Sequence, residues 1–154
     1  MGERSPVNDT DARGLFIGLS ADTTRADMTQ AVLEGVAFAI RDSFEVAQSL
    51  GIRIERSNIC GGGSKSLLWK TIFSNVLGIP LDTVQTEQGP SYGGAILAMT
   101  CCGEYKSVEE AVNTFVEVTD TVYPDKSLTA LYNERYERFK KIYPAVKKLY
   151  KEII

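Results

Sequence analysis

Three consecutive glycines, Gly61 to Gly63, are the feature of this sequence with the clearest chemical potential. They follow an apolar-alternating run that ends at Cys60 and predicts a strand, and they precede a pattern that predicts a helix from about Ser66. Because glycine has no Cβ, such a turn allows positive φ and lets a flat ligand lie against the main chain. Free N–H groups at the helix start would favour an anionic group. These features predict a nucleotide site, although many α/β domains use such a turn only as a connection.

The spacing around the glycines excludes two better-known phosphate motifs. A loop of the Gly-x-x-x-x-Gly-Lys-Ser type needs a glycine directly before its lysine, whereas Ser64 precedes Lys65 here. A dinucleotide fingerprint needs a small residue at position 66 and an acidic residue at a strand end about 20 positions later. Ser66 fits the first requirement poorly, and the acidic residue is absent. The remaining interpretation is a nucleotide site of another kind.

Length, composition and charge limit the classes of protein that fit. The 154 residues suit one domain, and 44% hydrophobic with 24% charged residues is typical of a globular protein. A net charge of -3 argues against nucleic acid or an anionic membrane as partner. No apolar run approaches the roughly 20 residues of a membrane span, and the N-terminus does not resemble a signal peptide. The expected location is the cytoplasm.

The sequence contains no histidine, which removes the usual general base and the commonest metal ligand. Proton transfer would therefore require a carboxylate or a group outside this chain, and no metal site is expected. Cys60, Cys101 and Cys102 are odd in number and two are adjacent, so a disulfide framework is not indicated. We expect three buried thiols.

A long amphipathic helix is the longest element that the sequence predicts. Thr24 and Asp27 form a variant capping box at its start, and Gly51 supplies a left-handed stop. Its apolar residues recur at steps of three and four and predict a buried stripe, which comprises Val32, Val36, Ala39 or Ile40, Phe44, Ala47 and Leu50. Glu34 lies between apolar neighbours, so it is either a buried polar anchor or a solvated helix residue. The solvated position is the one that we expect.

The rest of the chain predicts short strands and further helices. In the first part of the chain we expect a loop over 1–13 and a strand or strand-like loop over 14–19. After the second predicted helix we expect a strand over 81–84, a loop with Glu87 over 85–91 and a helix from 92. The C-terminal part predicts a helix over 107–115, a strand or extended segment over 116–122 and a charged helix from 127, interrupted near Pro144. Trp69 is expected in the core, although it could instead line a ligand pocket. So few strands predict an α/β chain that either pairs with itself or needs strands from a larger domain.

The order of several motifs resembles the FGGY family of carbohydrate kinases. The matching segments are Gly14–Leu19, Asp27–Glu34, Gly61–Ser66, Trp69, Gly78–Pro80, Glu87 and Gly93–Ala98. The lead-in before Gly14 follows a line typical of xylulose kinases. The resemblance covers nearly the whole chain and weakens after about Cys102. Its order and spacing are specific, although no single segment is.

The resemblance implies part of an actin-like (ribonuclease H-like) ATPase domain, of α/β class. It implies that residues 1–154 are the C-terminal portion of the kinase's C-terminal domain, with a lead-in loop at 1–13 and a C-terminal helix at 129–154. ATP would lie in a cleft between two domains. Gly61, Gly62 and Gly63 would line the adenine, ribose and α-phosphate, with Ser64 and Ser66 nearby.

The resemblance places no catalytic residue in this chain, and none of Asp9, Asp22 or Asp27 is expected to act as the base. In a complete kinase an aspartate takes the proton from the sugar hydroxyl as it attacks the γ-phosphoryl group of ATP, with Mg²⁺ offsetting the charge. The implied reaction converts D-xylulose and ATP to D-xylulose 5-phosphate and ADP. The isolated chain is expected to be inactive.

The implied partners are ATP or ADP, the sugar and the N-terminal domain of the same kinase. Apolar faces left without that domain predict a homo-oligomer. Two alternatives remain open. One is a related kinase acting on gluconate, glycerol, ribulose or rhamnulose, and the other is a non-catalytic binding module with the same fold.

Overall fold

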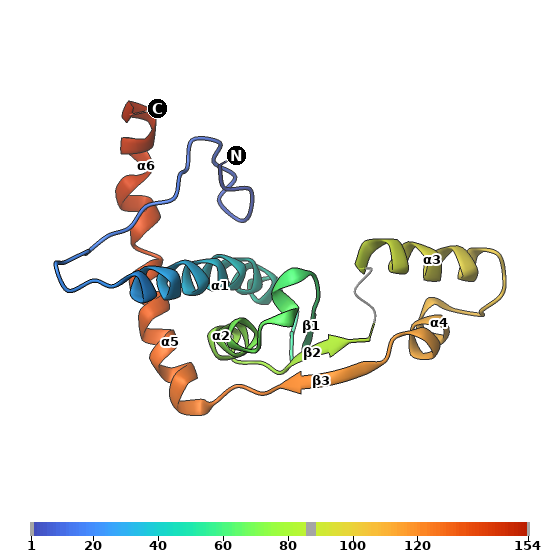
Figure 1. Cartoon of the computed structure of the whole chain (residues 1–154). Helices are drawn as coiled ribbons and strands as arrows, with labels where there is room; N and C mark the ends of the chain where they lie inside the picture. Colours follow the sequence, from blue (N-terminus) through green and yellow to red (C-terminus); the bar gives the residue numbers. More distant parts are fainter. Residues whose placement is uncertain (1, 86–88, 154) are drawn as a thin grey trace. The chain divides into compact units, whose positions relative to one another are not determined.

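The computed structural model describes residues 2–85 and 89–153, and the chain divides into two compact units (Figure 1). The helical unit contains residues 1–54, 75–78 and 124–154, and the sheet unit contains residues 55–74 and 79–123. Helix α2, Leu67–Leu77, begins in the sheet unit and ends in the helical unit. Glu87, whose role the sequence left open, lies outside the described residues.

The sheet unit is built on three strands in the order β1-β2-β3. Strands β1, Ser57–Ile59, and β2, Leu81–Val84, are parallel, and β3, Val118–Val122, pairs antiparallel with β2 (Figure 1). A parallel pair needs a crossover, which here consists of the short 3-10 helix η1, Gly62–Lys65, followed by α2. Because β1 and β2 run in the same direction, both strands end at the same edge of the sheet. The sequence predicted β2 and the extended segment that contains β3.

The buried carboxylate of Asp82 joins the strands of the sheet unit. Asp82 is only 3% exposed, and it accepts hydrogen bonds from Arg56 Nη2 at 2.8 Å and from Thr121 Oγ1 at 2.6 Å. A buried carboxylate is costly unless such partners replace its hydration. The bond from Arg56 holds the pKa of Asp82 below its ordinary value, and the Thr121 bond acts in the same direction. Asp82 therefore stays ionised and holds Arg56 and Thr121 against β2.

Helices α3, Gly89–Cys101, and α4, Val108–Phe115, connect β2 to β3 and pack on each other. The hydroxyl of Tyr92 donates to the carbonyl of Phe115 at 2.9 Å, and the Tyr105 and Phe115 rings meet edge to face at 5.4 Å. The predicted N-cap of α4 is confirmed, because the Ser107 side chain accepts from the Glu110 N–H at 3.1 Å.

The expected burial of the cysteine thiols is wrong. Cys60, Cys101 and Cys102 are all exposed and none forms a disulfide. Cys101 ends α3 and Cys102 follows it, and the buried side chain of this helix is Ile96. An apolar neighbourhood in the sequence therefore did not identify the buried face of this helix.

The helical unit contains α1, Arg25–Ser49, α5, Lys126–Phe139, and α6, Ile142–Ile153. The capping box at Thr24 and the left-handed Gly51 are confirmed, and Gly51 has a φ of 82°. Lys140 and Lys141 separate α5 from α6, and α6 begins two residues before Pro144. Pro144 lies in the first turn of α6, where the missing N–H breaks no helical hydrogen bond.

The face of α1 that the apolar pattern predicted as buried is the wrong one. Val32, Val36 and Ile40 are 52%, 42% and 42% exposed, whereas Glu34, Ala37 and Phe38 are buried. Phe38 packs against a cluster of aromatic rings on α5, with centroid distances of 5.2 to 6.1 Å, and the rings are those of Tyr132, Tyr136 and Phe139. A buried tyrosine hydroxyl needs a hydrogen-bond partner, which makes polar side chains useful on the facing helix. The tyrosines of α5 therefore pack against the face of α1 that carries both polar and apolar side chains, and the apolar stripe of α1 stays exposed.

Glu34 is a buried anchor, contrary to the solvated position expected for it. Arg135 Nη1 donates to both of its carboxylate oxygens, at 2.7 and 2.9 Å. Gln30 donates at 2.9 Å and the Tyr132 hydroxyl at 3.3 Å. Asp42, two turns further along α1, accepts from the Tyr136 hydroxyl at 2.6 Å. These side-chain hydrogen bonds hold α1 and α5 together in addition to the aromatic packing around Phe38.

No strand forms at 14–19, where the sequence predicted either a strand or a strand-like loop. The apolar side chains of this segment are exposed by between 39% and 62%, and they are Leu15, Phe16, Ile17 and Leu19. Hydrogen bonds instead connect the preceding residues to α6. Tyr143 donates to Asp9 Oδ2 at 2.5 Å and Tyr150 donates to the Arg13 carbonyl at 2.7 Å. In the part of the chain that the structure describes, no helix is long and apolar enough to cross a membrane.

Replacing Glu34 with alanine should lower the free energy of unfolding by about 2 to 3 kcal/mol, because Arg135 and the Tyr132 hydroxyl would lose a buried partner. Glu45→Ala on the same helix is the matched control. Glu45 pairs with Arg41 at the surface, and its loss should cost less than about 0.5 kcal/mol. Urea unfolding followed by circular dichroism measures both variants. Equal losses would contradict the role assigned to Glu34.

Candidate functional site

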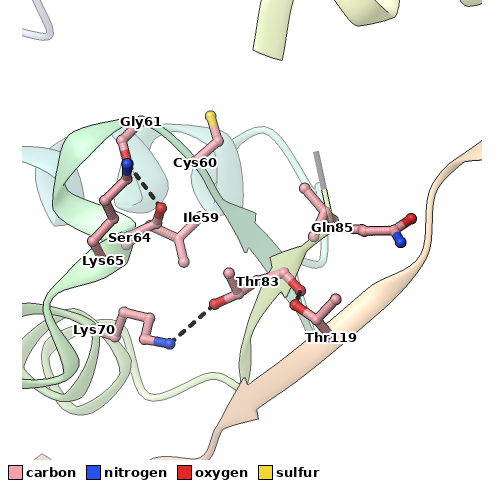
Figure 2. A pocket seen from close by; sticks show the side chains of 10 residues that line it. Ile59, Cys60, Gly61, Ser64, Lys65, Lys70, Thr83, Gln85 and Thr119 are labelled. Atoms are coloured by element: carbon pink, nitrogen blue, oxygen red, sulfur yellow. Dashed lines mark hydrogen bonds between the residues drawn. The ribbon is translucent and has the colours of Figure 1, made fainter. Parts of the chain in front are cut away.

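The sheet unit contains a pocket of about 360 Å³ at the carboxyl ends of β1 and β2 (Figure 2). Its lining residues belong to the end of β1, the glycine turn, α2, the end of β2 and the start of β3. They are Ile59, Cys60, Gly61, Ser64, Lys65, Lys70, Thr83, Val84, Gln85 and Thr119. The carboxyl ends of parallel strands form the edge at which open α/β sheets commonly bind ligands.

The glycine turn is a closed, hydrogen-bonded structure rather than a bare connection. Gly61 has a φ of 81°, in the left-handed region that favours glycine. Its carbonyl accepts two hydrogen bonds, from the Ser64 N–H at 3.1 Å and from the Ser64 hydroxyl at 2.7 Å. Gly61 and Ser64 therefore fix the wall that the turn presents to the pocket.

Gly62 and Gly63 are glycines for different physical reasons. A Cβ at Gly62 would have no neighbouring atom within 4 Å, so its backbone surface is open. A Cβ at Gly63 would lie 2.7 Å from the Trp69 ring, so this position requires glycine for packing. Trp69 is half-buried, stacks on Phe73 at 5.6 Å and does not line the pocket, which agrees with the packing role expected for it.

Ser66 directly precedes α2 and does not line the pocket. Its hydroxyl accepts from the Trp69 N–H at 3.3 Å, and its carbonyl accepts from the Lys70 N–H at 3.0 Å. The Trp69 N–H is thus bonded within the protein, so the start of α2 offers fewer donors to an anion than the sequence suggested. Of the five glycines and serines proposed from the sequence, Gly61 and Ser64 line the pocket, and Gly62, Gly63 and Ser66 lie in the adjoining turn.

A buried lysine is the feature of the pocket that the sequence analysis missed. Lys70 is 8% exposed, and its ammonium group donates to Asp120 Oδ2 at 2.7 Å. It also donates to Thr83 Oγ1 at 3.2 Å (Figure 2). The bond from Lys70 holds the pKa of Asp120 below its ordinary value, so the Asp120 carboxylate is ionised. The sequence did contain a signal for this residue, because Lys70 lies among the apolar positions of the predicted helix, four residues after Ser66.

The pocket has the donors expected of a site for an anionic ligand. Lys65 and Lys70 bring two positive charges, and Thr83 brings a hydroxyl group whose hydrogen is not used in a bond to the main chain. Among residues 2–85 and 89–153 no group of three or more histidine, cysteine or acidic side chains could hold a metal ion.

Comparison with known proteins gives a family match over most of the chain. Residues 1–102 match the model of the C-terminal domain of the FGGY family of carbohydrate kinases. A xylulose kinase from Staphylococcus epidermidis is 33% identical over 99% of this chain, and the chain covers 31% of that protein. The chain thus spans about a third of the length of this relative.

Two solved structures from Lactobacillus acidophilus resemble the chain. A ligand-bound xylulose kinase is 25% identical with a TM-score of 0.85, over 98% of this chain and 31% of that one. A gluconate kinase is 24% identical with a TM-score of 0.89, over 98% of this chain and 30% of that one, and at this identity it shows the fold alone. These neighbours are FGGY sugar kinases, whose C-terminal domain has the actin-like ATPase fold, so the predicted fold class is confirmed. The chain belongs to the FGGY family of carbohydrate kinases, in the family's C-terminal domain.

Proposed function

We propose that the pocket at the ends of β1 and β2 is the adenosine-binding side of an ATP site. The observation that carries this proposal is the glycine turn itself, which forms one wall of a pocket at the ligand-binding edge of the sheet. Family membership supports it, because carbohydrate kinases take their phosphoryl group from ATP. In this proposal Gly61 and Ser64 form the wall, and the open backbone at Gly62 receives the flat part of the nucleotide.

Gly63 and Ser66 would contribute indirectly to nucleotide binding. Gly63 allows the turn to close on Trp69, and Ser66 fixes the first turn of α2. Mg²⁺ prefers to bind through substrate phosphates and a few carboxylates rather than in a dedicated protein cage. Since the described residues offer no metal-binding cluster, Mg²⁺ would accompany the ATP phosphates.

We further propose that the chain is the C-terminal portion of an FGGY C-terminal domain and acts with an N-terminal domain of the same kinase. The reaction would transfer the γ-phosphoryl group of ATP to D-xylulose, giving D-xylulose 5-phosphate and ADP. The relative from Staphylococcus epidermidis supports xylulose as the sugar. Gluconate is the alternative that the Lactobacillus gluconate kinase favours, through the fold alone. The catalytic aspartate is not assigned to this chain.

Self-association is proposed from the exposed apolar side chains of α1. Val32, Val36 and Ile40 repeat at intervals of four residues and therefore share one face of the helix. Contiguous exposed apolar surface of this kind commonly marks an interface. A second copy of the chain can cover it with the same stripe, as in a two-fold dimer.

Gly62→Val should abolish nucleotide binding without disturbing the fold, because a side chain at this position meets only open space. Calorimetric titration with MgATP and ADP is the measurement. Affinity on the order of 1 mM, or about -4 kcal/mol, requires a high protein concentration. Gly35→Val on α1 is the matched control, since its Cβ also meets nothing within 4 Å. Unchanged binding by Gly62→Val would contradict the proposed adenosine surface.

The purified 154-residue chain should release no ADP in the presence of any of the candidate sugars. When the chain is joined to the kinase region that its relatives carry, D-xylulose should give the highest kcat/KM. The panel comprises xylulose, gluconate, glycerol, ribulose and rhamnulose, followed by a coupled ADP assay. Turnover by the chain alone would refute the proposal that catalysis needs the N-terminal domain. A preference for another sugar would refute xylulose as the substrate.

The purified chain should form a dimer or larger species, because self-association would remove the apolar stripe of α1 from water. Light scattering over a wide concentration range measures its mass. Val36→Glu, at the centre of the stripe, should shift the population towards monomer. A wild-type chain that remains monomeric throughout would rule the interface out.

A further inference from the structure

Lys70 lines the pocket and is the buried partner of its ion pair, which is unusual for a lysine. Its side chain is 10% exposed, whereas that of Asp120 is 55% exposed. A second ion pair of the sheet unit has the opposite arrangement, because the side chain of Asp82 is 4% exposed and that of Arg56 is 53% exposed. In the Arg56 pair the structure protects an anion from solvent, and in the Lys70 pair it holds a cation beside a pocket.

The hydrogen bonds around Lys70 leave the pocket with donors for an anion. Two of the three ammonium N–H groups point to Asp120 and Thr83. Since Thr83 Oγ1 accepts from Lys70, its own hydroxyl hydrogen can be donated to a ligand. Thr119 Oγ1 donates to the Thr83 carbonyl at 3.1 Å and keeps the start of β3 beside the end of β2 (Figure 2). Lys70 and Thr83 thus form a prepared pair of donors at the strand ends.

We propose that Lys70 binds a phosphoryl group of the nucleotide, with Thr83 as a second donor, and that Asp120 is the counterion with which this group competes. The inference rests on the proposed adenosine site and adds to it the residue that recognises the charge of the ligand. In the absence of nucleotide, Asp120 neutralises the buried ammonium group. When a phosphoryl group binds, the Asp120 carboxylate lies close to a second anion and weakens the complex.

The two members of the pair should therefore have opposite effects on binding. Lys70→Met should lower ADP affinity about tenfold, because a charge-assisted bond is lost. It should leave adenosine affinity unchanged, since adenosine carries no phosphoryl group. Lys70→Arg should retain most of the affinity for ADP. Asp120→Asn should raise ADP affinity severalfold and leave adenosine unaffected.

The experiment is calorimetric titration of the full chain and these variants with ADP and with adenosine. Lys106→Met is the matched control, because it removes the same charge from an exposed site in the sheet unit. If the Lys70–Asp120 pair were purely structural, the ratio of ADP to adenosine affinity would be unchanged in every variant. That result would overturn the proposed role of Lys70 and leave the proposed adenosine site standing. A loss of ADP affinity in Asp120→Asn would do the same. Wild-type chain that binds neither ligand would overturn the proposed adenosine site as well.

Discussion

The parallel pairing of β1 with β2 is the constraint on which the candidate site depends. Asn58 lies opposite Asp82 and Ile59 opposite Thr83, so the two strands finish together at one edge of the sheet. The crossover that a parallel pair requires begins with the glycine turn and continues into α2, which brings Lys70 to the same edge. Cys60, Gly61, Lys70 and Thr83 become neighbours for this topological reason. An antiparallel pairing of the same strands would have separated the turn from the end of β2.

Partnered buried charges recur in both units of the chain. Glu34 of the helical unit and Asp82 and Lys70 of the sheet unit are each at most 9% exposed, and each has at least two hydrogen-bond partners. The energetic reason is common to all three, because an ion removed from water needs substitutes for its hydration. The consequences differ. Glu34 and Asp82 hold secondary-structure elements together, whereas Lys70 lies beside a pocket.

Local signals in the sequence predicted most elements well. The capping box at Thr24, the Gly51 stop, β2 and the Ser107 cap depend on residues close together in the chain, and all are confirmed. The buried face of α1 could not be predicted in this way. It depends on the tyrosines of α5, about a hundred residues later, as the separations of 98 and 101 residues in the Glu34 bonds illustrate. The pocket likewise combines a local feature with a distant contact. The glycine turn could be predicted from neighbouring residues, whereas the contact between Lys70 and Asp120, which are 50 residues apart, could not.

The most direct test of the account is to find where ADP binds on the chain, by amide chemical shifts in the presence and absence of MgADP. If this pocket binds the nucleotide, the largest shifts should occur at Gly61–Lys65, at Thr83–Gln85 and at Thr119, which surround the pocket. Amides of α1 should show little change. Shifts that centre on α1 or spread evenly over the chain, or no shifts at millimolar ADP, would contradict the claim that this pocket is a nucleotide site.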